Sequence, residues 1–336
     1  MSTLPVIVGM DYSDATVQVC VLDLAGKEVG NRQCGNDWQE VQSFAESRGT
    51  VVRAAIESCC GAADLADELV MLAGWHVDLA HPGYVARMKQ SPDKTDYQDA
   101  RLIADLERVG YLPRVWLAPE PVRELRRLVR YRQQVVEQRR AVKLRVRALL
   151  REQRCRPPAP LRAWTKAWLM WVEKVAALSP QGRWIMAKHL QELSRLQAEV
   201  REAEKRLAQA TANDLIVATL RKQRGIGPVT AWTLRAEIGR FDRFCTGKQL
   251  ARFCGLSPRN ASSGQRVADA GLIRAASPAL RATIIETAHR LIRTEARWAQ
   301  MAARLRERGK PACVAVAAVA NRWIRKLYQQ MKEQAA

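Results

Sequence analysis

Four acidic residues in the first third of the chain have types and spacings that suit metal-assisted chemistry on phosphates. Asp11 and Glu57 each end a short apolar segment, so both carboxylates stand where a predicted β-strand gives way to a turn. Asp96 and Asp99 lie three residues apart on a predicted helix and therefore share one face. Carboxylates gathered in this way repel one another unless a hard cation neutralises them, and a pair of Mg²⁺ ions suits phosphodiester chemistry.

These acids also have a simpler interpretation, in which three are unrelated surface carboxylates and one caps a helix. Asp14, Asp23 and Asp93 compete for the same role. Asp93 lies in the first turn of the predicted helix, where the helix dipole alone favours an acid. The joint placement of two strand-end acids and a helical Asp pair in a basic protein favours the metal site.

The segment Leu220–Gly239 predicts a helix, a tight turn from Gly225 to Gly227, and a second helix. Glycines allow the backbone to approach a ligand closely, and N–H groups near a helix N-terminus bind anions. A helix-hairpin-helix element holds a DNA phosphate in this way without reading the base sequence. The alternative is a plain connection between two helices that needs glycine for steric reasons.

A polar loop of small residues, Phe253–Arg266, carries the adjacent serines Ser262 and Ser263 between Arg259 and Arg266. A serine on a glycine-flanked turn can expose its hydroxyl to a phosphodiester, and nearby guanidinium groups stabilise the charge that develops during attack. Serine is common in loops, so the loop alone does not identify a nucleophile.

The charge of the chain favours a polyanionic partner. The 336 residues include 55 Lys and Arg against 34 Asp and Glu, which gives a net charge of +21 and a pI near 10.2. Nucleic acid is the commonest such partner, and a basic surface without a specialised role is the alternative. A strongly basic helix is predicted over residues 120–153. There we expect nucleic-acid contacts from Arg126, Arg127, Arg130, Arg139, Arg140 and Arg147.

Composition also bears on the cellular compartment of the protein. No segment supplies the roughly 18 consecutive apolar residues of a membrane-spanning helix, and the N-terminus lacks the basic region of a signal peptide. The eight cysteines lack C-x-x-C spacing, so we expect reduced thiols and no zinc site. These features predict a cytoplasmic protein with no membrane partner.

The elements that must position the candidate residues fall into three parts. Residues 1–117 are predicted to be α/β, with strands near 6–11, 16–23, 51–57 and 76–80 and a helix from Ser91-Pro92 to about residue 109. Residues 118–214 hold the basic helix and a second long helix from about residue 184, whose apolar seam resembles a coiled coil. Residues 215–336 are predicted to be helical. The fold class is α/β plus all-α.

Together these segments resemble the DEDD transposases of bacterial insertion sequences in the IS110 group and the related Piv-type DNA invertases. VGMDYSDATVQVCVLD is similar to the first strand pair of this family, IESCCG to its glutamate segment, and KTDYQDA to its most specific signature. GIGPVTAWTLRAEIG, LARFCGLSP and ASSGQR are similar to its C-terminal transposase domain. The resemblance covers nearly the whole chain.

The resemblance implies an N-terminal domain similar to RuvC and RNase H, a long helical insertion, and a C-terminal transposase domain that holds a catalytic serine. That serine falls on Ser263, with Ser262 as the alternative. The four Mg²⁺-binding carboxylates of the family fall on Asp11, Glu57, Asp96 and Asp99.

The family mechanism implies further partners. A covalent phosphoserine link to DNA is expected, in a tetramer (a dimer of dimers) whose active sites combine domains of different subunits. A structured non-coding bridge RNA is expected to pair with donor and target DNA.

One segment departs from the family pattern, in which a Lys-Gly-Asn stretch follows the serine and leads to Leu-Arg. Leu280 and Arg281 are present here, but Ala276-Ser277-Pro278 replaces the Gly-Asn turn. This departure affects the backbone contacts expected at that turn.

Two other functions remain open at this point. One is a Holliday-junction-type nuclease, in which metal-activated water attacks the phosphodiester and Ser263 takes no part. The other is a non-catalytic nucleic-acid-binding protein in which the four acids are structural.

Overall fold

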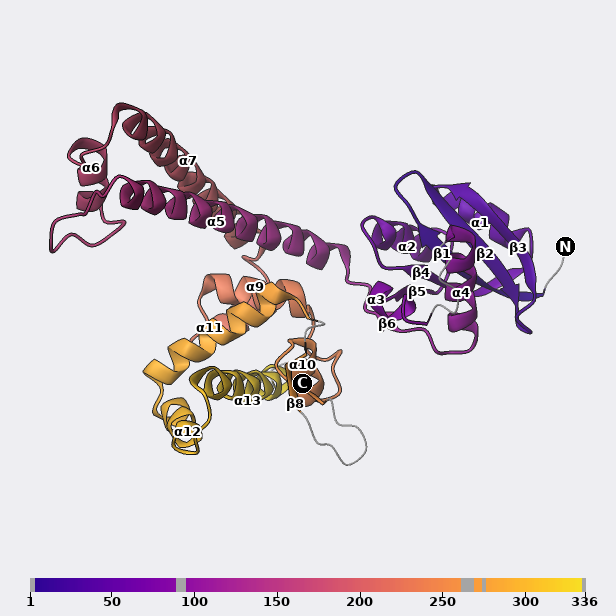
Figure 1. The fold of residues 1–336 in the computed structure, drawn as a ribbon. Helices are drawn as coiled ribbons and strands as arrows, with labels where there is room; N and C mark the ends of the chain where they lie inside the picture. The colour runs from indigo at the N-terminus through magenta and orange to yellow at the C-terminus, as the bar shows by residue number, and fades with distance from the viewer. Residues whose placement is uncertain (1–3, 89–94, 261–268, 274–275, 334–336) are drawn as a thin grey trace. The chain divides into compact units, whose positions relative to one another are not determined.

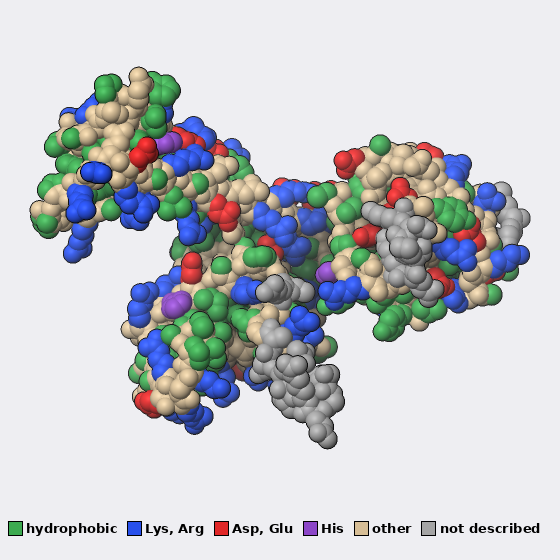
Figure 2. Space-filling view, viewed as in Figure 1, with side chains coloured by type: hydrophobic (Ala, Val, Ile, Leu, Met, Phe, Trp, Pro, Cys, Tyr) green, Lys and Arg blue, Asp and Glu red, His purple; other side chains and the backbone are tan. Residues whose placement is uncertain are grey.

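The computed structural model describes residues 4–88, 95–260, 269–273 and 276–333 (Figure 1). The chain forms two compact units, residues 1–119 and residues 120–336. Lys and Arg side chains are prominent on both units in the space-filling view (Figure 2), in keeping with the net charge of +21. The first unit is α/β and the described part of the second is mainly helical, which confirms the predicted combination. The division near residue 214 stays a prediction.

The described residues of the N-terminal unit form a six-stranded sheet with the order β3-β2-β1-β4-β5-β6. The first three strands are antiparallel, β4 and β5 continue parallel to β1, and β6 is antiparallel to β5. The predicted hairpin of the first two strands is therefore confirmed. In chain order the strands are β1 (Pro5–Tyr12), β2 (Thr16–Asp23), β3 (Glu28–Gly35), β4 (Thr50–Glu57), β5 (Val77–Ala80) and β6 (Arg114–Val115).

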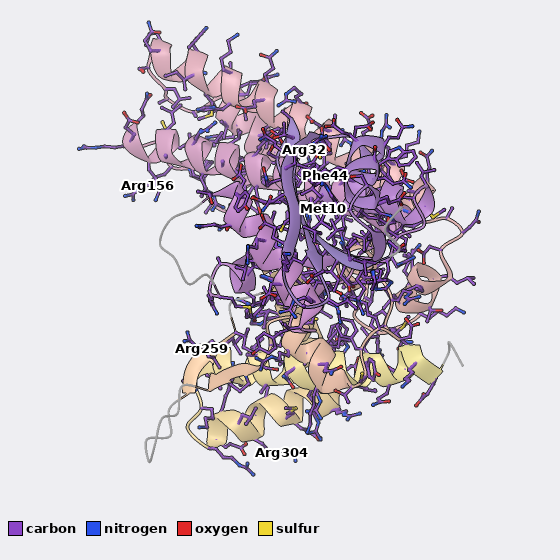
Figure 3. The ribbon with its side chains drawn as sticks, turned by 90° about the vertical axis from the view of Figure 1, so that its right-hand side faces the viewer. Met10, Arg32, Phe44, Arg156, Arg259 and Arg304 are labelled. Carbon is purple, nitrogen blue, oxygen red and sulfur yellow. The ribbon has the colours of Figure 1, made fainter. Side chains whose placement is uncertain are left out.

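Different helices cover the two faces of this sheet. The described helices of the unit are α1 (Trp38–Glu46), α2 (Ala62–Met71), α3 (Pro82–Val85) and α4 (Asp96–Arg108). On one face α1 and α2 pack against alternate residues of β1, and Met10 and Phe44, labelled in Figure 3, belong to this core. On the other face Ala100 and Ala104 of α4 pack against Cys20 of β2. Side chains that alternate along β1 therefore face α1 and α2 or face α4.

The helix α4 lies directly on β1. A Cβ atom at Gly9 would stand 2.2 Å from the carbonyl oxygen of Ala100 and 2.3 Å from the backbone nitrogen of Ala104. Only glycine allows this approach of helix to strand. The side chain of Thr95 caps the helix by accepting a hydrogen bond from the backbone N–H of Gln98 at 3.3 Å. The predicted start at Ser91-Pro92 lies outside the described residues.

The C-terminal unit begins with an arm, defined as residues 120–210. Its helices are α5 (Glu120–Glu152), α6 (Lys166–Lys174) and α7 (Pro180–Ala210). The apolar stripe predicted on the second long helix packs against α5, with Val142 of α5 and Leu196 of α7 among the buried contacts. That helix starts earlier than predicted, because Ser179 accepts from the N–H of Gly182 and Pro180 occupies the first turn.

The remaining helices gather around a second core that includes Trp232, Ile284 and Trp298. Leu125 of α5 and Leu207 of α7 join the same core and thereby attach the base of the arm. None of the described helices is both long enough and apolar enough to cross a membrane. The elements are α8 (Leu215–Arg221), α9 (Pro228–Ile238), α10 (Gly247–Phe253), β7 (Pro258–Asn260), β8 (Asp269–Leu272), α11 (Pro278–Thr294), α12 (Ala296–Glu307) and α13 (Ala312–Glu333).

Replacing Gly9 with valine should destabilise the N-terminal unit, because the new side chain would overlap the backbone of α4. We expect the free energy of unfolding of this unit to fall by at least about 2 kcal/mol. Pulse proteolysis in urea, followed through an N-terminal tag, measures the change. Gly83→Ala is the control, since a Cβ there meets only the His81 ring, at 3.3 Å. Equal stability of Gly9→Val and wild type would contradict the direct contact.

Candidate active site

Asp11 and Glu57 occupy equivalent positions on neighbouring parallel strands. In the pairing of β1 with β4, Met10 stands opposite Ile56, and the next residue on each strand is the carboxylate. Both acidic residues are half-buried. Glu57 is the last residue of β4, as predicted, whereas β1 continues one residue past Asp11, to Tyr12. The topology adds that the two strands are adjacent.

Both carboxylates point to the sheet face that α4 covers. Side chains two residues apart on a strand lie on the same face, so Asp11 shares the face of Gly9 and Glu57 shares the face of Ala55. Gly9 contacts the backbone of α4, and Ala55 packs in one core with Ile103 of that helix. The two acids therefore stand at the end of β1 and β4, on the side of α4.

The first turn of α4 contributes the other two acids. Asp99 is buried, with 3% of its surface exposed, and directly precedes Ala100, which contacts β1 at Gly9. Asp96 is exposed one turn earlier. The structure thus gathers Asp11, Glu57 and Asp99 on one face of the unit, while Asp96 stands at the solvent-facing start of the helix.

The thiol of Cys59 gives a second indication that the strand-end acids are close together. Burial raises the pKa of this thiol above its usual value, and the negative charges of Glu57 and Asp11 raise it further. The Cys59 sulfur also lies 3.8 Å from the carbonyl oxygen of Tyr12, the residue after Asp11. The charges of both carboxylates therefore act on the pKa of one thiol.

The competing acids have other surroundings. Asp23 accepts a hydrogen bond from the backbone N–H of Lys27 at 2.8 Å, and its register partner is Val6, at the opposite end of β1 from Asp11. Asp14 is exposed in the turn between β1 and β2. Asp93 lies outside the described residues.

The donor chemistry of the site suits a hard divalent cation. Asp11, Glu57 and Asp99 supply only carboxylate oxygens, which Mg²⁺ prefers. In the part of the chain that the structure describes, no three His, Cys, Asp or Glu side chains stand close enough together to hold a metal ion. The residues therefore fit the cation in donor type and backbone placement, without a formed coordination shell.

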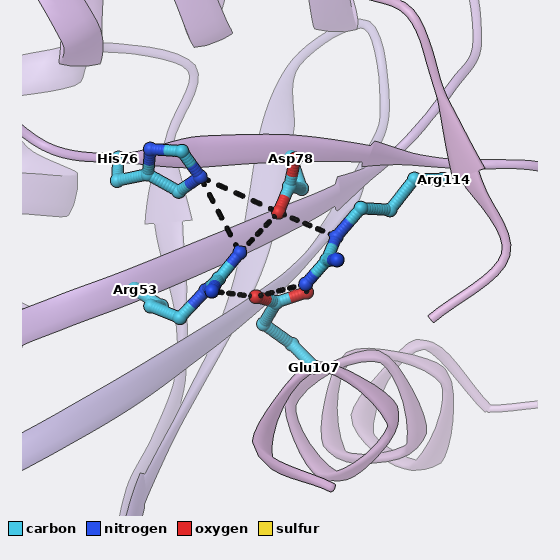
Figure 4. Close-up of polar contacts among 5 residues, drawn as sticks. All are labelled: Arg53, His76, Asp78, Glu107 and Arg114. Atoms are coloured by element: carbon cyan, nitrogen blue, oxygen red, sulfur yellow. Dashed lines mark hydrogen bonds and ion pairs between the residues drawn. The ribbon is translucent and has the colours of Figure 1, made fainter. Parts of the chain in front are cut away.

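An ion cluster around one buried carboxylate lies at the other end of α4 (Figure 4). The side chain of Glu107 is fully buried and pairs with Arg53 of β4 and with Arg114 of β6, the latter at 3.1 Å. Asp78 of β5 pairs with the same two guanidinium groups, at 2.8 Å and 2.7 Å. His76 lies 3.6 Å from Asp78 at the rim. Sequence reasoning missed this cluster, since no spacing reveals contacts among three strands and a helix.

The glycine turn of the C-terminal unit has a steric role at its first position. Gly225 has a φ of +81°, and a Cβ there would stand 2.8 Å from the Leu291 side chain. Its carbonyl oxygen accepts a hydrogen bond from Arg290 at 3.3 Å. Gly227 caps α9; among the described residues no atom lies within 4 Å of a Cβ placed there, and no side chain caps this helix. Phosphate binding at Gly227 stays a prediction.

The arginines of the basic arm divide into two groups. Arg126 donates to the carbonyl oxygen of Ala236 at 2.6 Å, and Arg130 pairs with the buried Glu237 at 3.1 Å. These two side chains join α5 to α9. Arg127 pairs with Glu124 on its own helix.

Further along the arm the basic charge is less compensated. Burial lowers the pKa of Lys143, and the nearby charges of Arg139 and Arg147 lower it further. Lys143 and Arg147 both lie over the Trp164 ring, at 4.8 Å and 5.6 Å from its centroid. Arg140 is exposed on the same helix. Positive charge therefore gathers on this part of α5, and nucleic-acid binding there stays a prediction.

The serine loop is described only in part. Arg259, labelled in Figure 3, is exposed on β7. Ser262, Ser263 and Arg266 lie outside the described residues. At the segment that departs from the family pattern, Ser277 caps α11 by accepting from the N–H of Leu280 at 3.3 Å, with Pro278 in the first turn.

Comparison with known proteins decides the family. Residues 8–154 match the DEDD transposase family of the IS110 type, and residues 217–303 match the IS116/IS110/IS902 family of transposases. The chain belongs to the IS110 family of transposases. The resemblance inferred from its motifs is thereby confirmed. A transposase is an enzyme that acts on DNA.

Three relatives of this transposase carry transposase names. The transposase y4qE of Sinorhizobium fredii is 28% identical over 224 residues, which are 66% of this chain and only 54% of that protein. The transposase for insertion sequence element IS1111A of Coxiella burnetii is 25% identical over 93% of this chain and 86% of its own length. A family 20 transposase of Pseudomonas aeruginosa is 29% identical over 96% of this chain and 95% of its own length.

Removing the buried charge of Glu107 should loosen α4, because Arg53 and Arg114 would lose the one of their two shared carboxylates that α4 supplies. We expect Glu107→Gln to lower the opening free energy of α4 by about 3 kcal/mol. Native-state hydrogen exchange of α4 peptides would then accelerate by about two orders of magnitude. The control is Glu202→Gln, which removes an exposed partner of Arg206 on α7. Unchanged protection in α4 would show that the cluster does not anchor this helix.

Proposed function

We propose that this transposase cleaves and rejoins DNA strands with Asp11, Glu57, Asp96 and Asp99 as the ligands of Mg²⁺ and Ser263 as the nucleophile. The observation that carries the proposal is the gathering of Asp11, Glu57 and Asp99 on the α4 face, at the shared end of two parallel strands. Membership of a DEDD transposase family supports the same assignment.

The four acids have distinct positions from which to act. Asp11 and Glu57 stand on strands whose backbones are fixed by the sheet, so they define the two rigid sides of the site. Asp99 lies on the buried face of α4. Asp96 adds a carboxylate from the exposed first residue of the same helix. When bound, Mg²⁺ would offset the charge of the scissile phosphate and lower the pKa of an attacking hydroxyl.

Each step of the proposed reaction exchanges one ester bond to phosphorus for another. The Ser263 hydroxyl oxygen attacks the phosphorus, a Ser–O–P bond forms, and the bond from phosphorus to one deoxyribose oxygen breaks. The serine proton passes to solvent, and the departing oxygen takes up a proton. In the second step the oxygen of a deoxyribose hydroxyl attacks the phosphorus of the phosphoserine, and the Ser–O–P bond breaks. The attacking hydroxyl loses its proton to solvent, and the released serine oxygen takes one up. Bond exchange of this kind needs no high-energy cofactor.

The partners of the proposed reaction follow from charge and from chain organisation. A structured bridge RNA, paired with donor and target DNA, would bind the exposed arginines of the arm, including Arg140 and Arg147. The carboxylates and the serine belong to separate compact units. This separation is compatible with a tetramer, a dimer of dimers, in which one subunit supplies the serine to the carboxylates of another.

A second candidate reaction is hydrolysis by a Holliday-junction-type nuclease. All four acids belong to the N-terminal unit, so attack by metal-activated water would need no residue of the serine loop. The two reactions differ in one product, the covalent protein–DNA adduct.

Asp99→Asn should abolish strand cleavage while leaving DNA binding unchanged, because the carboxylate would serve the cation rather than grip the DNA backbone. We expect the cleavage rate to fall at least about 100-fold, which corresponds to about 2.7 kcal/mol of lost transition-state stabilisation. The measurement is single-turnover cleavage of donor DNA in Mg²⁺. Asp14→Asn, which changes an exposed turn acid, is the control and should cleave normally. Wild-type rates in Asp99→Asn would remove Asp99 from the site.

Ser263→Ala should bind DNA and Mg²⁺ but form no covalent adduct. The test is to incubate each protein with labelled donor DNA, denature it, and look for a DNA-linked protein band. Ser262→Ala is the matched control and should keep the band. A band that vanishes only in Ser262→Ala would move the nucleophile by one residue. A wild type that cleaves without ever forming the band would favour the hydrolytic nuclease.

A further inference from the structure

The C-terminal unit contains a basic hollow between α12 and α13, far along the chain from the serine loop and from the arm. It has a volume of about 330 Å³, and its lining includes four arginines and no acid. At the end of the unit where Figure 1 labels α12, Figure 2 shows many more blue side chains than red ones. The arginines that line the hollow are Arg297, Arg304, Arg308 and Arg322.

These arginines differ from others in the same unit, because no ion pair is found for any of the four among the described residues. Arg130, Arg132 and Arg235, by contrast, pair with Glu237, Glu204 and Asp214. The guanidinium groups of the hollow remain available to an external anion.

The hollow has an apolar floor, and the four guanidinium side chains around it are exposed. Trp298 is buried, Met301 and Leu305 are half-buried, and all three line it. Like charges over an apolar surface are screened less well than charges surrounded by water. The Arg297 guanidinium also lies 5.0 Å from the centre of the Trp298 ring, which fixes its position. A polyanion bound here would offset the positive charge of the four exposed guanidinium groups.

The spacing along α12 fits an extended backbone better than a single small anion. Arg297, Arg304 and Arg308 follow one another at seven and four residues, so they share one face of the helix. At about 1.5 Å per residue they span about 16 Å, the rise of about five phosphates along one strand of B-DNA. Arg322 faces them from α13.

We propose that the hollow between α12 and α13 is a binding site for the sugar-phosphate backbone of duplex DNA. The site would be independent of base sequence, because guanidinium groups that contact phosphates position a duplex without reading it. Arg304, Arg308 and Arg322 lie beyond residue 303, where the match to the second transposase family ends. The inference rests on the action of the transposase on DNA and does not depend on the carboxylates or on Ser263.

The experiment compares two full-length double variants that each lose two positive charges. Arg304→Gln with Arg308→Gln removes two guanidinium groups from the hollow. Arg293→Gln with Arg306→Gln removes two exposed charges that do not line it. Fluorescence anisotropy of a labelled duplex, in chelator and over a range of KCl concentrations, gives Kd and its salt dependence for each protein.

The hollow variant should bind duplex DNA at least about 10-fold more weakly at low salt. Its slope of log affinity against log salt should be smaller by about 1.8, because two phosphate contacts are lost. The control variant should keep the wild-type slope. Arg304→Lys with Arg308→Lys, which keeps both charges, should recover most of the affinity and shows that a loss does not come from misfolding.

Three results would overturn the inference. They are a wild-type slope in the hollow variant, an equal loss in the control variant, and a loss of affinity for single-stranded RNA of the same sequence without loss for duplex DNA. Binding in chelator involves no cleavage, so its outcome is separate from that of the proposed reaction. If the hollow variant loses DNA affinity and adducts never form, the inference stands while the serine mechanism fails.

Discussion

At Gly9 the backbone of a central strand meets the backbone of α4 with no side chain between them. This contact sets the height of the helix above the sheet, and with it the distance between Asp99 and the strand-end acids Asp11 and Glu57. Packed interiors do not deform continuously, so a larger residue at Gly9 would displace the helix rather than be absorbed. A displacement of about 1 Å in a reacting geometry can cost about 100-fold in rate. The proposed chemistry therefore depends on a residue that carries no side chain.

The arginines of this transposase serve two physical purposes. Arg53 and Arg114 share the buried carboxylate of Glu107 and fix the end of α4, while Arg126 donates to the backbone of α9. These charges are compensated within the fold. Arginines of the second kind lie along the outer arm and around the hollow between α12 and α13, where positive charge exceeds nearby acid. The net charge of +21 thus leaves a surplus for a polyanion after the structural pairs are made.

Sequence patterns predicted the central elements and missed those whose signal is weak or depends on topology. The strands β1, β2, β4 and β5 and the long helices carry clear apolar periodicity, and the motif residues identified the family. The strand β3 escaped prediction because EVGNRQCG is mostly polar and mostly half-buried, without a clear apolar alternation, and β6 has only two residues. The sequence could not reveal that Arg126 and Arg130 contact α9, because their partners on that helix lie more than one hundred positions away in the chain. Apolar periodicity shows which face of a helix or strand is buried, but it does not show which other element packs against that face.

The central claim is that Asp11, Glu57 and Asp99 form one site for a divalent cation on the α4 face. Anomalous diffraction from crystals of the full-length transposase soaked in Mn²⁺ tests it most directly, because Mn²⁺ replaces Mg²⁺ at oxygen ligands and scatters anomalously. The account predicts an anomalous peak within bonding distance of the carboxylates of Asp11, Glu57 and Asp99. Ordered carboxylates with no peak between them, in crystals that bind Mn²⁺ elsewhere, would contradict it.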